Sequence, residues 1–312
     1  MPKLTLPAAA ALLALGLVCG AAQAQPTRVF VAAQGLDANP CTFAAPCRTL
    51  QHAHDTVAAG GEIDVLDPAG YGAVTITKSI SIQAHGFAGI SVPGGTTGII
   101  INAGLNDYVN LNGLIIEGAG IALNGISFFA GGALMIENCV VRNVTTTAIA
   151  FVPSSTSSLT VSNTLVAETG AYGILVQPVS AASITAIFNR VEAYRYGQVG
   201  IGVLADLGAN STVRAHAVDS VAAQPRSEAG SIGFLAKANG AGNFARFDVH
   251  RSSGFRNEVN MVADGTSAIL ILSQSQSISS SPYSGTNGGK IFSYGDNYLD
   301  GSSGGLSALP RS

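Results

Sequence analysis

The sequence has little charge, no tryptophan and only one long hydrophobic run, and each shortage narrows the possible protein classes. Charged residues make up 11% of the 312 residues, whereas about 25% is usual for a globular protein. Gly, Ser, Thr, Ala and Val take their place, which favours a β structure with many turns of small residues over surface helices. No second stretch of membrane-spanning length follows the first run, so we expect no membrane span. A net charge of −3 gives no reason to expect a nucleic-acid partner.

The first 24 residues have the pattern of a secretory signal peptide. Lys3 precedes an apolar run from Leu4 to Val18, and Ala22-Gln23-Ala24 is a small-residue cleavage motif. We therefore expect cleavage near Ala24 and a mature protein that is secreted or periplasmic. Because exported proteins meet oxidants, Cys41 and Cys47 are expected to form a short disulfide. Cys139 is expected to be a buried free thiol, and no Cys/His spacing indicates a metal site.

A pair of apolar residues separated by one variable residue recurs along the chain, at spacings of 23 to 31 residues. The pairs are Ile99/Ile101, Ile126/Phe128, Ile149/Phe151, Ile174/Val176, Ile201/Val203, Ile232/Phe234 and Val259/Met261. Period-two alternation with constant members predicts strands that are buried on one face. Repeats of this length without a helical period predict a β-solenoid, since leucine-rich repeats need a Leu-x-x-Leu-x-Leu pattern and propeller blades need about 40 residues.

A second apolar column and an asparagine column are expected in the same coils. The apolar column is Leu114, Val140, Leu165, Val191, Val218, Val249 and Leu299. In one coil Gln276 interrupts this apolar column. The residues two positions before each member of the column, and before Gln276, are Asn112, Asn138, Asn163, Asn189, His216, Phe247, Gln274 and Asn297. Stacked asparagines at one turn can hydrogen-bond along the stack and tolerate a tight bend. We therefore predict an asparagine ladder, with His216 as one of its members.

The two ends of the mature chain differ from the repeats. Residues 25–61 are expected to form an N-terminal strand and an amphipathic capping helix over Pro46–Ala59, which covers the open edge of the first coil. Residues 62–301 are expected to form the solenoid, and residues 302–312 a flexible tail.

The chain resembles a known family in these segments. The runs GLDANPCTFAAPCRTLQHAH, EIDVLDPAGYGAVTI and KSISI begin at Gly35, Glu62 and Lys78, and IFSYGDNYLDG closes the repeats at Ile291–Gly301. They are similar to secreted bacterial pectin-lyase-like proteins. The resemblance implies an all-β, single-stranded right-handed parallel β-helix. It implies no single activity, because that superfamily includes lyases, hydrolases, epimerases, phage tailspikes and adhesins.

The catalytic motifs of that superfamily are missing from the sequence. There is no adjacent Asp-Asp with Gly-His-Gly, no calcium-binding cluster of aspartates and no Asp-Pro-His-Glu. We therefore expect no cofactor, with Ca²⁺ as an unsupported option. If the protein is an enzyme, a polysaccharide lyase or a glycoside hydrolase is the expected type.

One constellation of polar residues could carry chemistry. Glu192, Asp219 and His250 follow the apolar column on three consecutive coils, and they are expected to point outward in one column about 5 Å apart. Carboxylates at that distance raise each other's pKa, which suits acid–base catalysis on a sugar. The alternative is that they are ordinary solvated residues, since Val141 and Val166 begin the same column.

The coils around these residues are basic. Residues 190–256 contain eight Lys or Arg against five acids, which suits an anionic ligand. The residues expected to bind it are Arg190, Tyr194, Arg195, Tyr196, Arg214 and Arg251. The leading hypothesis is an exported protein that binds, and in one version processes, an acidic extracellular or envelope polysaccharide. The alternative is a non-catalytic surface or adhesion protein that uses the β-helix face for partner contacts, and the oligomeric state is open.

Overall fold

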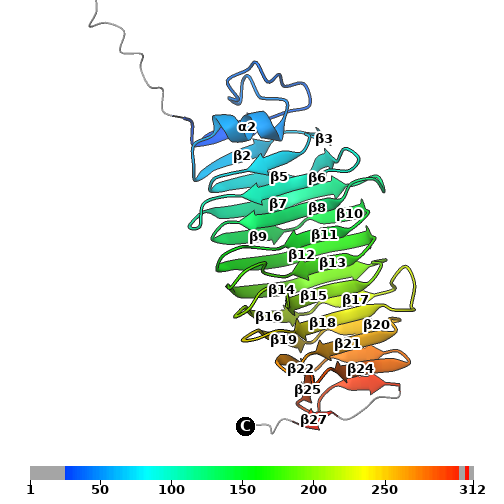
Figure 1. Ribbon diagram of the computed structural model, residues 1–312. Coiled ribbons are helices and arrows are strands. Elements are labelled where there is room, and N and C mark those ends of the chain that lie inside the picture. Colours follow the sequence, from blue (N-terminus) through cyan, green and yellow to red (C-terminus); the bar gives the residue numbers. More distant parts are fainter. Residues whose placement is uncertain (1–24, 302–305, 309–312) are drawn as a thin grey trace, which may run out of the picture.

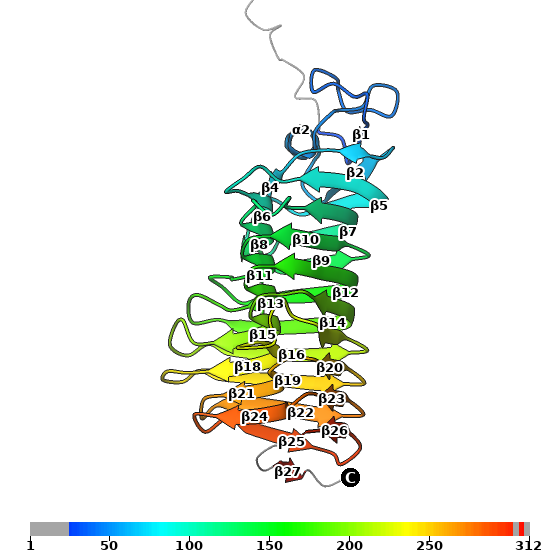
Figure 2. The same cartoon turned by 90° about the vertical axis from the view of Figure 1, so that its right-hand side faces the viewer.

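The protein is a right-handed parallel β-helix, as expected from the sequence. The computed structural model describes residues 25–301 and 306–308. Over these residues the chain forms an elongated stack of coils, in which each coil pairs in parallel with the next (Figures 1 and 2). The predicted signal peptide, residues 1–24, lies outside the described residues, as do residues 302–305 and 309–312 of the predicted tail. Leu306 packs against the core, and Ser307–Ala308 pairs with an earlier strand.

One sheet of the described chain has nine strands, one from each successive coil. Its strands are β4 (Val74–Ile76), β6 (Thr97–Asn102), β8 (Asn124–Ala130), β11 (Thr147–Phe151), β13 (Tyr172–Val176), β15 (Val199–Ala205), β18 (Ile232–Ala238), β21 (Val259–Asp264) and β24 (Ser281–Thr286).

The other sheet has eighteen strands within the described residues. They are β1 (Arg28–Val31), β2 (Gly61–Val65), β3 (Ala69–Gly70), β5 (Ile80–Ser91), β7 (Tyr108–Glu117), β9 (Ala133–Glu137), β10 (Val140–Val144), β12 (Ser157–Thr169), β14 (Ser183–Tyr194), β16 (Thr212–Val218), β17 (Val221–Ala223), β19 (Phe244–His250), β20 (Ser253–Phe255), β22 (Ala268–Ser273), β23 (Gln276–Ile278), β25 (Lys290–Ser293), β26 (Tyr298–Asp300) and β27 (Ser307–Ala308).

A column of left-handed residues divides the larger sheet into two arms. From the coil of β9 onward it consists of Asn138, Asn163, Arg190, Asp219, Arg251 and Gln274, with φ from 43° to 54°. We call this column the corner, the strands before it the first arm, and the strands after it the second arm. The corresponding residue in β7 is Gly113, where a Cβ atom would lie 2.5 Å from the backbone nitrogen of Gly86. Only glycine fits there.

The predicted inner column is confirmed through Ile201 and is wrong in the two following coils, where Phe234 and Met261 continue the column in place of Ile232 and Val259. Ile99, Ile126, Ile149, Ile174 and Ile201 pair in consecutive coils and are fully buried. In the next coil Phe234 pairs with Ile201 and continues the column, while Ile232 pairs with Val199. Ile232 instead belongs to an apolar cluster outside the core. The ladder skips the residue before the inner column in this coil as in the coil before it, at Gly233 and Gly200, so Ile232 occupies the outward position of Val199.

The predicted second apolar column does not exist as one row. Val140 pairs with Leu165, but Leu165 pairs with Glu192 and not with Val191. Val218 pairs with His250 and not with Val249. The predicted residues lie at different positions relative to the corner: Leu165 is two residues after it, Val191 one residue after it, and Val218 and Val249 lie before it. A slip of one residue exchanges the two faces of a strand, so these residues do not share a face. The buried row after the corner is Ile116, Val141, Val166, Ala193 and Ala222.

The asparagine ladder is confirmed in its first members and wrong in the middle coils. Asn138 Nδ2 donates to Asn112 Oδ1 at 3.0 Å, and Asn163 Nδ2 donates to Asn138 Oδ1 at 3.3 Å. Arg190 continues the ladder through its Nε atom, which donates to Asn163 Oδ1. The three residues predicted for the next rungs are placed elsewhere. Asn189 and His216 lie on the outer face of the first arm, and Phe247 lies in the core.

A second ladder of side chains lies inside the helix, one residue after the corner. The backbone N–H of Ser220 donates to Ser252 Oγ at 3.1 Å, and that of Ser252 donates to Ser275 Oγ at 3.2 Å. Thr164 occupies the same position in an earlier coil and accepts from the N–H of Cys139. Cys139 is buried and free, as expected, and its thiol contacts the carbonyl of Glu137 as Ser252 Oγ contacts that of His250.

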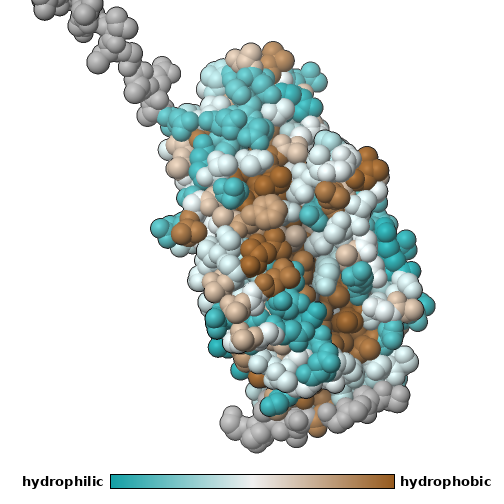
Figure 3. Space-filling model, viewed as in Figure 1, coloured by the Kyte–Doolittle hydropathy of each residue, from teal (hydrophilic) through white to brown (hydrophobic). Residues whose placement is uncertain are grey.

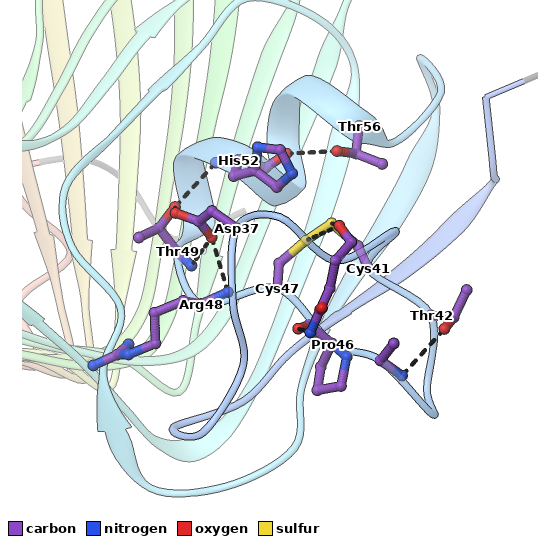
Figure 4. Close-up of a disulfide and its surroundings, with 11 residues drawn as sticks. Asp37, Cys41, Thr42, Pro46, Cys47, Arg48, Thr49, His52 and Thr56 are labelled. Carbon is purple, nitrogen blue, oxygen red and sulfur yellow. Dashed lines mark hydrogen bonds between the residues drawn. A yellow bond between two sulfur atoms is a disulfide. The ribbon is translucent and has the colours of Figure 1, made fainter.

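The N-terminal cap is shorter than predicted. Helix α2 covers Leu50–Thr56 and not residues 46–59, because Thr49 has an extended backbone and its side chain accepts a hydrogen bond from the N–H of His52. The helix lies at the N-terminal end of the stack and buries Leu50 against the first strands (Figure 1). The predicted disulfide between Cys41 and Cys47 is present beside the helix (Figure 4).

Candidate functional site

Four charged or titratable side chains meet at the corner in the middle coils, and we call them the corner cluster: Arg190, Asp219, His250 and Arg251. Arg251 makes two hydrogen bonds to the Asp219 carboxylate, from Nε at 2.8 Å and from Nη2 at 3.0 Å. Its Nη1 lies 2.8 Å from His250 Nε2. Arginine has no acceptor, so His250 accepts at Nε2, and its Nδ1–H donates to Ser273 Oγ. The hydrogen bond and the charge of Arg251 lower the pKa of Asp219, and the charge of Arg190 acts in the same direction.

The structure does not place Glu192 in this cluster, so the predicted Glu192–Asp219–His250 column is wrong. Glu192 lies in the second arm, where it pairs with Leu165 and Val221. Asp219 is at the corner, and His250 is in the first arm beside Val218. The three residues therefore do not form the stack of like charges on which the predicted catalytic role was based.

Arg214 lies on the outer face of the first arm, in a shallow hollow of about 460 Å³. We call this surface the arginine face, and it consists of Thr185, Ile187, Arg214, His216, Arg246 and Asp248 on strands β14, β16 and β19. Arg214 pairs with Arg246 in the ladder, so two guanidinium groups lie on adjacent strands.

The two arginines differ in their partners. Arg246 forms an ion pair with Asp248 at 2.8 Å. The guanidinium of Arg214 lies 4.9 Å from the centre of the Phe244 ring, and no carboxylate of the described residues is within ion-pair distance of it. The stacking restrains the side chain without neutralising its charge. Arg214 therefore presents a restrained, uncompensated cation.

The remaining predicted ligand-binding residues lie near the end of β14. Tyr196 is fully buried, and its hydroxyl donates a hydrogen bond to Asn257 Oδ1, so it is not exposed to a ligand as predicted. Tyr194 is partly buried, and burial together with the nearby charge of Glu192 raises its pKa. Arg195 has a left-handed backbone, and its Nε atom lies 3.5 Å from Glu168 Oε1. None of these three lines the hollow of the arginine face.

A larger groove of about 590 Å³ lies on the outer face of the nine-stranded sheet, and the sequence analysis missed it. Its apolar side chains include Tyr172, Ile232, Leu235 and Val262. Some residues between the two members of an inner pair, such as Leu175, are themselves apolar and lie in this outer cluster. The sequence analysis treated these positions only as variable and therefore did not predict an apolar outer surface.

The charges in this groove are largely paired. Lys237 Nζ lies 3.1 Å from Asp206 Oδ2, and the hydrogen bond between these side chains raises the pKa of Lys237. The charge of Asp264 acts on Lys237 in the same direction. Burial raises the pKa of Tyr172, so its hydroxyl stays protonated at neutral pH. The one cation that lines the groove therefore has two carboxylates beside it.

One group of possible metal ligands occurs in the described part of the chain. The ligand atoms of Cys41, Cys47 and His52 lie within 4.8 Å of one another. Figure 4 draws His52 on helix α2 and the two cysteines beside it. The two sulfur atoms are bonded to each other and are therefore not available as thiolate ligands. Among the same residues, no helix has the length and apolar character needed to cross a membrane.

Comparisons with known proteins identify the fold. No protein-family profile and no curated protein matches the sequence. Among solved structures, pectate lyase Pel9A is 17% identical with a TM-score of 0.65, over 91% of this chain and 78% of the lyase. An alginate lyase from Paenibacillus sp. str. FPU-7 is 14% identical with a TM-score of 0.58, over 89% of this chain and 97% of the lyase. At these identities the likeness shows a shared parallel β-helix.

Proposed function

We propose that the protein is exported and binds an acidic polysaccharide on the arginine face. The observation that carries this proposal is Arg214, a restrained cation without a carboxylate partner, next to Arg246 in an open hollow. A flat guanidinium group can donate two parallel hydrogen bonds to a carboxylate. The signal-like residues 1–24 support export, and the lyases with the same fold are named for acidic polysaccharides, pectate and alginate.

The groove on the nine-stranded sheet is a poorer site for a polyanion. Its one cation, Lys237, faces two carboxylates, so an anionic sugar there would meet repulsion without a free positive partner. The carboxylates of Asp248 on the arginine face and of Asp219 in the corner cluster each pair with an arginine. Arg190 and Arg214 are cations in excess of these pairs. Charge therefore directs the ligand to the first arm.

Processing of the bound chain remains part of the hypothesis, as a lyase or a glycoside hydrolase reaction that involves Asp219 and His250. Their contacts fit binding better than acid–base catalysis, because Arg251 keeps Asp219 ionised and occupies His250 Nε2. Incubation with pectate and alginate, followed by ultraviolet absorbance for unsaturated ends and by a reducing-end assay, tests both reactions. Product in either assay that is lost in Asp219→Asn supports processing. Silence in both assays, with and without Ca²⁺, rules it out for these substrates.

Binding is tested by titrating pectate into the purified protein at several salt concentrations. We expect Arg214→Ala to weaken binding about tenfold, which corresponds to about 1.4 kcal/mol, and the affinity to fall with added salt. Arg142→Ala is the matched control, since Arg142 is exposed in the second arm and pairs with Glu117. Equal affinities for the two variants would contradict the proposed site. Polysaccharide binding by neither the parent protein nor the variants would favour the non-catalytic surface or adhesion role.

A further inference from the structure

Two cysteines and a histidine meet at the N-terminal cap, where the sulfur atoms of Cys41 and Cys47 and a ring nitrogen of His52 lie within 4.8 Å of one another. Their Cys-x5-Cys-x4-His spacing differs from common zinc motifs, in which about two to four residues separate the cysteines. Both cysteines are fully buried, whereas His52 is partly exposed on helix α2. The face of the cap drawn in Figure 3 is mainly hydrophilic. Water and dissolved ions therefore reach His52, while the sulfur atoms lie below the surface.

The fold does not use the imidazole ring of His52. Both hydrogen bonds of this residue involve its backbone: the N–H donates to Thr49 Oγ1 at 3.2 Å, and the carbonyl accepts from Thr56 Oγ1 at 2.9 Å. Within the part of the chain that the structure describes, the ring nitrogens have no hydrogen bond and no ion pair. An imidazole in this condition, next to two sulfur atoms, is available as a metal ligand.

The backbone holds the two cysteines in place independently of the bond between their sulfur atoms. The N–H of Phe30 donates to the carbonyl of Cys41 at 2.8 Å, and the N–H of Cys47 donates to the carbonyl of Phe30 at 2.9 Å. Asp37 accepts from the N–H and the hydroxyl of Thr49, and so ties the cysteine loop to the start of helix α2. The same positions are therefore held in a protein with two free thiols.

Asn39 provides an acceptor for the reduced state. Its carbonyl oxygen lies 3.9 Å from Cys41 Sγ and 3.8 Å from Cys47 Sγ. A disulfide has no proton to donate, whereas a thiol has one. This contact becomes a hydrogen bond only after reduction, so the pocket suits two free thiols as well as the disulfide.

We propose that in the reduced protein Cys41, Cys47 and His52 bind one zinc ion. This site lies at the N-terminal end of the stack (Figure 1) and is independent of the proposed function. Two thiolates and an imidazole are ligands that zinc prefers, at Zn–S distances of about 2.3 Å and Zn–N distances of about 2.0 Å. Tetrahedral ligands at these distances lie about 3.5–3.8 Å apart, and the three atoms are already within 4.8 Å. Water takes the fourth position, as in other zinc sites with three protein ligands.

Zinc and the disulfide compete for the same two sulfur atoms. Binding of the ion to two thiols releases two protons, because only thiolates ligate zinc. A disulfide-bearing oxidant then takes two electrons from the thiolates: the Cys41–Cys47 bond forms, the oxidant takes up two protons and becomes a dithiol, and the zinc ion leaves. A dithiol reductant, with zinc present, reverses this step. The ion therefore holds the cap together whenever the disulfide is absent.

The test is a titration of the reduced protein with Co²⁺, whose absorption bands report thiolate ligands, followed by competition with Zn²⁺. A phosphine opens the disulfide and is removed without oxygen before the titration. We expect one ion per chain in the reduced protein and none in the oxidised protein. His52→Ala should weaken zinc binding by about 100-fold or more, since loss of even a residue that supports a ligand costs about 10–100-fold.

Two variants serve as controls. His85→Ala removes another histidine of the N-terminal coils, and Cys139→Ser removes the buried third thiol. Both should bind zinc as the parent protein does. Circular dichroism of the metal-free variants checks that each has the parent fold.

Thermal melts give a second measurement that does not depend on cobalt. Zinc should raise the melting temperature of the reduced parent protein and leave that of reduced His52→Ala unchanged. Folding of the reduced chain only with zinc present would also support the site. Equal zinc affinities of the reduced parent and His52→Ala, or no uptake by the reduced parent, would overturn the proposal. Equally strong uptake by the oxidised protein would place the ion elsewhere and overturn it as well.

Discussion

Replacement of Ser252 by alanine tests whether the inner ladder supports the coils that carry the proposed site. Ser252 is buried, and its Oγ accepts the N–H of Ser220 at 3.1 Å and donates to the carbonyl of His250 at 2.8 Å. Alanine removes both hydrogen bonds and leaves the N–H of Ser220 buried without a partner. Such an orphaned donor costs about 1–3 kcal/mol. We expect a loss of stability in that range, with little contribution from packing because only one oxygen atom is removed.

The assay is urea unfolding, combined with hydrogen exchange at the amide of Ser220. Each coil contacts mainly its neighbours, so the effect should be local, and the protection of that amide should fall before the unfolding midpoint moves far. Ser183→Ala is the control, because Ser183 is exposed on β14 and surface substitutions usually change stability by less than about 0.5 kcal/mol. Equal midpoints and equal protection in the two variants would refute the role of the ladder.

Three further predictions follow from individual residues. Burial raises the pKa of the Cys139 thiol to about 11, so a thiol reagent at pH 8 should modify Cys139 only after unfolding, and Cys139→Ser should change the unfolding free energy by less than about 1 kcal/mol because a hydroxyl suits this ladder position. The hydrogen bond from Ser79 lowers the pKa of Asp107, so the stability that Asp107 provides is present above its unfolded pKa of about 3.9 and is lost as pH falls through the lower folded value. Thermal melts between pH 2 and pH 6 should therefore show a weaker acid dependence in Asp107→Asn than in the parent protein. Glu192→Gln should leave polysaccharide affinity within about twofold of the parent value in the same titration, since Glu192 lies in the second arm beside Leu165; a larger loss would return this residue to the site.

The sequence was sufficient for the fold because the inner positions repeat with little variation. The isoleucines from Ile99 to Ile201 lie between residues of freely varying type, and this contrast locates a strand in each coil. The disulfide and the first rungs of the asparagine ladder were equally accessible, since both depend on residue types with few structural roles. The register failed where the pattern carried less information. At Ile232, two apolar residues flank Gly233, and only the ladder shows which of them faces the core.

The candidate site was harder to predict because its geometry depends on the corner, and the corner does not keep one residue type. Asn138 and Asn163 mark it clearly, since asparagine tolerates a left-handed backbone. In the next three coils the same position holds Arg190, Asp219 and Arg251, and arginine does not signal such a bend. The sequence analysis followed Asn189 instead and aligned Glu192, Asp219 and His250, which lie two residues after the corner, at the corner and one residue before it.

The same substitution at the corner explains where the charge of this weakly charged protein is concentrated. In the early coils the ladder is a row of neutral amides, which satisfy one another. From Arg190 onward it becomes arginine, aspartate and arginine, in which Asp219 is bound by Arg251 and is close enough to Arg190 for the two charges to interact. Two cations on one anion leave an excess positive charge at the corner, which follows the strand that carries Arg214. The side chains at the corner therefore still stack from coil to coil, and the ladder gains a cation that amides do not supply. A polyanion lying along the first arm meets both the corner cluster and the arginine face.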